Sequence, residues 1–207
     1  MAQERPPTIL QIYRDTVKPG REAAFKAVEE DAARICAELR FPHSHLAIES
    51  LSGPTEVWWL NAFESEEDRQ RVADDYGKNP ALKEALEGIT RRKEGLTEAP
   101  VNVYATYRAE LSRGASWKVA GARFFVVTIS AGDSRMEGAV FEAPDGTRFV
   151  FRPFATRPQA DAVAAAAGRD TRVFAVRPCW GMPAPEWIAA DPVFWKPNPM
   201  ARVREEP

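Results

Sequence analysis

Hydrophobic and polar positions alternate in the first segment, TILQIYRD at residues 8–15, which predicts a β-strand. After a Pro19–Gly20 turn, apolar residues recur at steps of three and four. This spacing predicts a helix of roughly 20 residues with one buried stripe made of Phe25, Val28, Ala32, Ile35 and Leu39. Pro42 ends that helix, because the residue before a proline is pushed out of the α region.

A hairpin, a divided helix and a fourth strand follow. The alternating run at 46–51 and the aromatic run at 55–63 are joined by a Ser-Gly-Pro turn, which indicates two paired strands. Ser65 with an acidic first turn begins a helix, and Asn79–Pro80 restarts it. Because residues 101–111 alternate again, the order through residue 111 is βαββαβ.

The second half repeats this plan with one helix fewer. Strand patterns at 122–130 and around the Pro-Asp-Gly turn at 144–146 precede a helix that ends at Gly168 and a closing strand at 172–178. The order is βββαβ. We therefore predict an α+β protein of two tandem ferredoxin-like modules, residues 8–111 and 119–180. We expect the remainder, 181–207, to be an irregular, aromatic and Pro-rich tail packed along the outside.

The first module resembles a known superfamily. The Lys-Pro-Gly-Arg turn at 18–21, the βαββαβ order and the WWLNAFES run at 58–65 resemble the ferredoxin-like dimeric α/β-barrel superfamily, over residues 8–110. Antibiotic-biosynthesis-type monooxygenases and NIPSNAP-like proteins belong to it. The resemblance implies a pocket in each module and, with 120–178 as the second sheet, a fused, pseudo-twofold barrel. Its heme-degrading members use a histidine from the module's second helix, and residues 65–95 contain none.

Strand parity separates two faces of the predicted first sheet. We expect one face to lie beneath the helices, made of Leu10, Ile12, Leu46, Ile48, Trp58, Leu60, Val101 and Val103. The other is polar and aromatic, as ligand sites often are, and we expect it to face a small-molecule ligand in the barrel interior. Its catalytic candidates are His45 and Asn61, and its substrate-binding candidates are Gln11, Tyr13, Glu49, Trp59, Asn102 and Tyr104. A surface without a ligand is the alternative interpretation.

The only two histidines, His43 and His45, are two residues apart. Because Pro42 disturbs the backbone, we expect the regular strand to start near His45. His45 would then face the interior, and His43 would cap the strand outside it. Two imidazoles without a third ligand cannot complete a zinc site from protein alone, so we predict no metal. Phosphate-loop, dinucleotide and metallopeptidase motifs are absent from the sequence, and we predict no cofactor.

Composition narrows the class of protein. Of the 207 residues, 44% are hydrophobic and 28% charged, which is typical of a soluble globular chain. A net charge of −2 argues against nucleic-acid binding. No apolar run is long enough for a membrane span, and MAQERPP does not resemble a secretory signal, so we expect a cytoplasmic protein without a membrane partner.

Three functions remain open at this point. The first is a cofactor-independent oxygenase or isomerase that acts on an aromatic or conjugated metabolite. The second is a non-catalytic ligand-binding or stress-associated module. The third is an interaction protein that docks through the aromatic tail around Trp187 and Trp195. The sequence does not decide whether the protein is an enzyme or whether it forms a homodimer.

Overall fold

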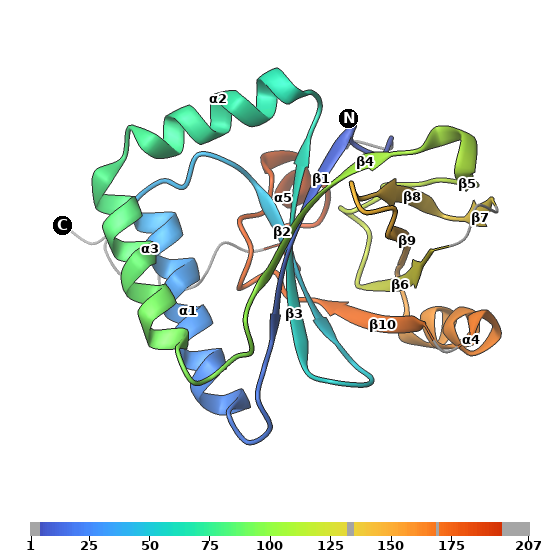
Figure 1. The fold of residues 1–207 in the computed structure, drawn as a ribbon, viewed down its shortest axis with the longest axis horizontal. Coiled ribbons are helices and arrows are strands. Elements are labelled where there is room, and N and C mark those ends of the chain that lie inside the picture. Colours follow the sequence, from blue (N-terminus) through green and yellow to red (C-terminus); the bar gives the residue numbers. More distant parts are fainter. Residues whose placement is uncertain (1–4, 132–134, 169, 196–207) are drawn as a thin grey trace.

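The computed structural model describes residues 5–131, 135–168 and 170–195 (Figure 1). Its helices are α1 (Glu22–Glu38), α2 (Glu66–Gly77), α3 (Pro80–Lys93), α4 (Arg157–Ala167), α5 (Pro185–Ala190) and the 3₁₀ turn η1 (Ala109–Leu111). Its strands are β1 (Ile9–Thr16), β2 (His45–Ser50), β3 (Glu56–Phe63), β4 (Val101–Tyr107), β5 (Ser112–Arg113), β6 (Phe124–Ser130), β7 (Met136–Glu137), β8 (Ala139–Glu142), β9 (Arg148–Phe154) and β10 (Thr171–Val176).

Eight strands close into an antiparallel barrel in the order β1-β3-β2-β10-β6-β9-β8-β4. The first sheet, β4-β1-β3-β2, comes from the first half of the chain, and the second sheet, β10-β6-β9-β8, comes from the second half. When the four barrel strands of each half are numbered from 1 to 4 along the chain, both sheets have the order 4-1-3-2. Two seams join the sheets: β4 pairs with β8, and β2 pairs with β10. Each half therefore completes the other.

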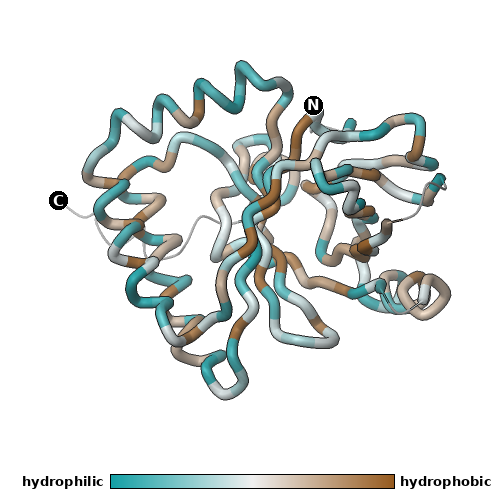
Figure 2. The backbone as a smooth tube through the Cα atoms, in the orientation of Figure 1, coloured by the Kyte–Doolittle hydropathy of each residue, from teal (hydrophilic) through white to brown (hydrophobic). Residues whose placement is uncertain are grey.

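Helices α1, α2 and α3 lie on the outer side of the first sheet (Figure 1). The side chain of Ser65 caps α2 by accepting a hydrogen bond from the Asp68 amide, and Asn79 caps α3 in the same way through Leu82. Only Val72 of α2 is buried, and Figure 2 shows that α2 is largely hydrophilic. It is therefore a thin cover, whereas α1 and α3 pack closely together.

The barrel interior is a solid apolar core. Trp58 lies there with the rings of Phe149, Phe151 and Phe174, at centroid distances of 4.9–6.4 Å. The same core contains Leu10, Ile12, Leu46, Ile48 and Leu60. The expectation that this face lies beneath the helices is wrong. Parity divides a strand into two faces, but it does not say which face meets the second sheet, and a closed eight-stranded barrel fills its interior with side chains.

The tail packs differently from the expectation. It forms the short helix α5, and beyond it Trp195 joins the barrel core with only 1% of its surface exposed. The indole N–H of Trp195 donates a hydrogen bond of 2.8 Å to the Ala120 carbonyl. Trp187 packs beside it at a centroid distance of 5.2 Å. Both rings therefore pack against the protein's own core. Residues 196–207 of the predicted tail lie outside the described ranges.

None of the helices in the described ranges combines the length and apolar character that a membrane crossing requires.

Replacing Trp195 by alanine should lower the free energy of unfolding by about 3–5 kcal/mol, because it removes a fully buried ring from the core. It also leaves the Ala120 carbonyl without its donor. A denaturant titration measures the change. Val193→Ala is the matched control, because Val193 is 77% exposed two residues away. A loss below about 1 kcal/mol for Trp195→Ala would mean that the tail only rests on the surface.

Candidate functional site

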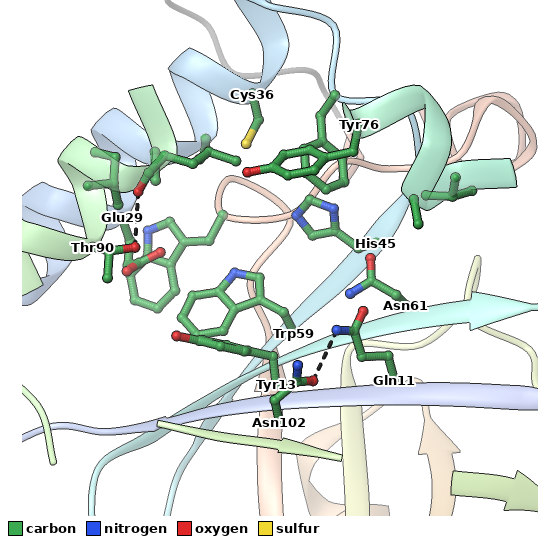
Figure 3. A pocket seen from close by; sticks show the side chains of 18 of the residues that line it. Gln11, Tyr13, Glu29, Cys36, His45, Trp59, Asn61, Tyr76, Thr90 and Asn102 are labelled. Atoms are coloured by element: carbon green, nitrogen blue, oxygen red, sulfur yellow. Dashed lines mark hydrogen bonds between the residues drawn. The ribbon is translucent and has the colours of Figure 1, made fainter. Parts of the chain in front are cut away.

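A cavity of about 510 Å³ lies between the outer face of the first sheet and helices α1–α3 (Figure 3). We call it the helix–sheet pocket. Its floor consists of Gln11, Tyr13, His45, Trp59, Asn61, Phe63, Asn102 and Tyr104. Its helical walls consist of Glu29, Ala32, Ala33, Cys36, Arg69, Val72, Ala73, Tyr76, Leu86, Ile89, Thr90 and Lys93, and the loop residues Phe41 and Trp180 complete it. All the predicted site residues except Glu49 are brought together here.

The strand register explains why the floor is continuous. His45 lies opposite Asn61, and Asn61 lies opposite Gln11, so these three side chains cross β2, β3 and β1 in one row. Gln11 donates a hydrogen bond of 3.0 Å to the Asn102 side chain on β4. Tyr13 lies opposite Trp59, and their rings meet edge to face at 5.8 Å. One polar row and one aromatic row therefore form the floor.

The polar face predicted to line the barrel interior lies on the outer side of the first sheet instead. The apolar core occupies that space among the described residues, and the polar face is on the opposite side of the same strands. Glu49 is also misplaced. It forms an ion pair with Arg177 at the edge of a separate hollow of about 300 Å³, which Cys179 also lines. Glu49 lies four residues along β2 from His45, and its partner Arg177 follows the last strand of the second sheet.

His45 is the most enclosed polar residue of the floor, with 8% of its surface exposed. Burial lowers the pKa of its imidazole to about 4, so the ring is neutral at physiological pH. Its Nδ1 is buried and has no hydrogen-bond partner within the described ranges. Figure 3 shows the ring pointing into the space between Tyr76 and Trp59. A neutral imidazole has one donor and one acceptor nitrogen, so this ring can form a hydrogen bond with a ligand in the pocket.

His43 lies outside the pocket, and the strand begins at His45, as the Pro42 argument predicts. The His43 Nε2 is 2.9 Å from the Ala62 carbonyl, and its ring stacks on Phe63 at 4.7 Å. The two imidazoles thus have different surroundings. Within the described ranges, no three His, Cys, Asp or Glu residues are grouped so that they could hold a metal ion.

A buried ionic cluster that the sequence analysis missed closes one end of the pocket. The Lys93 ammonium lies 2.9 Å from Asp15 Oδ2 and 2.5 Å from Glu29 Oε1. It also lies 4.5 Å above the Trp59 ring. Both carboxylates are almost fully buried. We call Asp15, Glu29 and Lys93 the ionic cluster, and it ties β1, α1 and α3 together.

The cluster's protonation follows from two carboxylates sharing one ammonium. Burial raises the pKa of Glu29, and the attraction of Lys93 only partly offsets this. Burial acts against the charge of Lys93, but the two carboxylates outweigh it and raise the pKa of the ammonium. Lys93 therefore stays charged, and Glu29 is a carboxylate that holds its proton more tightly than usual.

The sequence did carry a signal for Glu29. The buried stripe of α1 consists of Phe25, Val28, Glu29, Ala33 and Cys36, which is rotated from the predicted one. Glu29 is one turn after Phe25, so a charged residue stands within an apolar stripe, where charges are rare unless paired. No local pattern in the sequence indicated that Trp180 lines the pocket, because Trp180 follows β10 and is distant in sequence from the other lining residues.

Trp180 arrives because its segment pairs with the start of β2. His45 and Met182 exchange backbone hydrogen bonds of 2.9 and 3.0 Å. Gly181 lies between Trp180 and Met182 in the chain, and a Cβ at Gly181 would be 2.6 Å from the His45 carbonyl oxygen. Only glycine permits this approach. The Trp180 indole N–H is buried and, like His45 Nδ1, lacks a partner in the described part of the chain.

Comparison with known proteins gives fold-level similarities only. No family model matches the chain, and no curated protein sequence matches it. A solved structure of a provisionally assigned monooxygenase from Fusobacterium nucleatum is 12% identical, with a TM-score of 0.49, over 81% of this chain and 91% of that one. Another, from Lactobacillus acidophilus, is 6% identical, with a TM-score of 0.48, over 81% and 93%. An anthrone oxidase-like protein is 11% identical, with a TM-score of 0.41, over 82% and 92%.

Replacing Lys93 by methionine should lower the free energy of unfolding by about 3–5 kcal/mol near neutral pH, because it leaves Asp15 and Glu29 buried without a cation. The loss should shrink as the pH is lowered from about 8 to about 5, since the folded state then takes up a proton on Glu29 and loses the uncompensated charge. Denaturant titrations at several pH values measure both effects.

The control is Lys26→Met, which removes a lysine of α1 whose side chain is 63% exposed and pairs with Glu30. Its effect should stay below about 0.5 kcal/mol at every pH. A Lys93→Met penalty that does not change with pH would contradict the assignment of Glu29 as the group that takes up the proton.

Proposed function

We propose that the protein binds a flat aromatic or conjugated small molecule in the helix–sheet pocket. The observation that carries this proposal is the His45 Nδ1, which is buried and unpartnered in the described ranges and belongs to a residue that lines the cavity. An unpaired buried polar group costs about 1–3 kcal/mol. A ligand that bonds to His45 recovers this free energy.

The walls favour a planar ligand. Trp59 and Tyr13 form an aromatic surface on the floor, and Tyr76 of α2 lies across the space from Trp59 (Figure 3). Aromatic side chains bury a large area and stack on flat rings at little entropic cost. The cavity volume lies within the range of small-molecule sites, roughly 300–1,000 Å³. Size, shape and polarity therefore agree on one class of ligand.

The fold supports the resemblance to the dimeric α/β-barrel superfamily as part of this proposal. The first and second sheets share one strand order and exchange edges at both seams, which is the arrangement that two tandem ferredoxin-like modules would give. In this interpretation α4 is the helix of the second module within the described residues, whereas α1, α2 and α3 belong to the first module and cover its pocket.

Catalysis without a resident cofactor is the second candidate function, and the pairing of His45 with Asn61 favours it. A neutral imidazole can take a proton from an acidic carbon or hydroxyl of the ligand, and the Asn61 amide can donate to the oxygen that becomes negative. Returning the proton to another carbon completes an isomerisation. Addition of dioxygen, the required co-reactant, to the carbanion would instead form a C–O bond and a peroxide anion. The imidazolium would return its proton to that anion and give a hydroperoxide that keeps both oxygen atoms. Because the pKa of His45 is about 4, it becomes an effective base only beside that anion.

Binding of 2-naphthol and naphthalene, measured by calorimetry, tests the proposal. The two probes share a ring system and differ by one hydroxyl group. 2-Naphthol should bind about tenfold more tightly, because its hydroxyl pairs with His45 Nδ1, and His45→Phe should abolish that difference. The substitution leaves an aromatic ring at this position, so the affinity for naphthalene should change little.

His43→Phe is the matched control. It keeps the stacking on Phe63 and removes only the contact with the Ala62 carbonyl outside the pocket, so both affinities should stay as in the unsubstituted protein. Failure of both probes to bind, or the same tenfold preference in His45→Phe, would overturn the proposed function.

A further inference from the structure

We propose that the natural ligand of the helix–sheet pocket carries a positive charge, an amine or another organic cation, at the end next to Glu29. This inference rests on the proposed function and adds the charge of the ligand to it. It depends on an imbalance in the ionic cluster, on the aromatic ring beside that cluster, and on the free polar atom at the other end of the same cavity.

The imbalance is visible in the contacts. The Lys93 ammonium has two carboxylate partners, Asp15 at 2.9 Å and Glu29 at 2.5 Å. One carboxylate is enough to cancel its charge. Asp15 is 1% exposed and Glu29 is 2% exposed, so water cannot solvate the second negative charge. Glu29 lines the cavity and Asp15 does not. The surplus charge therefore lies on the side of the ionic cluster that borders the cavity.

No other charged group of the pocket cancels this surplus in the described ranges. Arg69 on α2 lines the pocket, but its charge is already paired with Glu66. The remaining titratable side chains of the lining are Tyr13, Cys36, His45, Tyr76 and Tyr104. The Cys36 thiol, whose pKa is raised by burial to about 12, and the neutral His45 add no charge near pH 7. The cluster thus has one carboxylate more than cations.

The surroundings suit an organic cation. Trp59 already holds the Lys93 ammonium at 4.5 Å from its ring, which is the geometry of a cation–π contact. Figure 3 shows Glu29 and Thr90 at one end of the pocket and His45 and Asn61 at the other, with Trp59 between them. Because the His45 Nδ1 is independently unpartnered, the pocket presents polar groups at both ends and an aromatic floor between. A flat ligand with a cationic group at one end and a hydrogen-bonding group at the other matches all three.

The surplus negative charge of the ionic cluster would disfavour an anionic ligand. Such a ligand would have to lie against two buried carboxylates whose one ammonium is already shared between them. Like charges at close range in a poorly solvated site repel strongly, whereas an opposite charge offsets the cost of burial. The pocket should therefore rank ligands of one shape as cation first, neutral second and anion last.

This preference should depend on pH in one direction. Burial raises the pKa of Glu29, so lowering the pH protonates it and removes the surplus charge. The pKa of Lys93 and that of Tyr13 lie above their ordinary values, and that of His45 lies near 4. None of these three titrates between about pH 5 and about pH 8. The cation preference should be largest at the upper end and fall toward the lower end.

Three probes of one shape test the inference: 2-naphthylmethylammonium, 2-naphthylmethanol and 2-naphthoate, titrated by calorimetry near pH 8. We expect the ammonium probe to bind at least tenfold more tightly than the alcohol, and the carboxylate more weakly than the alcohol. Glu29→Gln should abolish the difference in affinity between the ammonium probe and the alcohol. Glu30→Gln, next in α1 and half exposed with Lys26 as its partner, should change none of the three.

The outcomes separate this inference from the proposed function. Equal affinities for the ammonium and the alcohol in the unsubstituted protein would overturn the inference and leave ligand binding standing, and this comparison needs no variant to fold. A tenfold preference that survives in Glu29→Gln would also overturn it. Absence of binding by all three probes would overturn both proposals.

Discussion

The closure of two four-stranded sheets into one barrel is the constraint on which the rest of this structure depends. At the seams, β2 pairs with β10 and β4 with β8, so no sheet edge is left open among the eight strands. Once closed, the interior must be filled, and Trp58 with the phenylalanine rings of the second sheet fills it. The helix–sheet pocket lies instead on the outer face of the first sheet, beneath α1, α2 and α3.

That outer space is shaped by unequal cover. Helices α1 and α3 are locked to β1 by the ionic cluster, whereas α2 contributes only one buried side chain. The ionic cluster therefore fixes one end of the pocket, and α2 covers the pocket with little packing. Burying two carboxylates with one ammonium has a large desolvation penalty, and apolar residues of similar size often join such elements with a more favourable free energy. The proposed recognition of a cation by Glu29 would give this arrangement a role besides stability.

The sequence predicted the helices and strands better than it predicted how they pack against one another. Alternation along β1 and β3 sorted Gln11, Trp59 and Asn61 correctly onto one face, because backbone geometry alone fixes parity. It could not assign that face to the helices, because both faces of these strands are covered and neither is plainly solvated. The Glu49 prediction failed because parity gives the face of a residue but not its distance along the strand: Glu49 lies four residues from His45 and pairs with Arg177. Lys93 was missed because a terminal helical lysine is ordinarily solvated.

The close approach at Gly181 means that the first half of the chain does not form the pocket alone. Trp180 reaches the first half's pocket only because Gly181 lets the chain after β10 run against the His45 backbone. Recombination that exchanged the second half for another barrel half would preserve the strands of the floor and lose one wall. Substitutions in either half can therefore change the shape of the pocket.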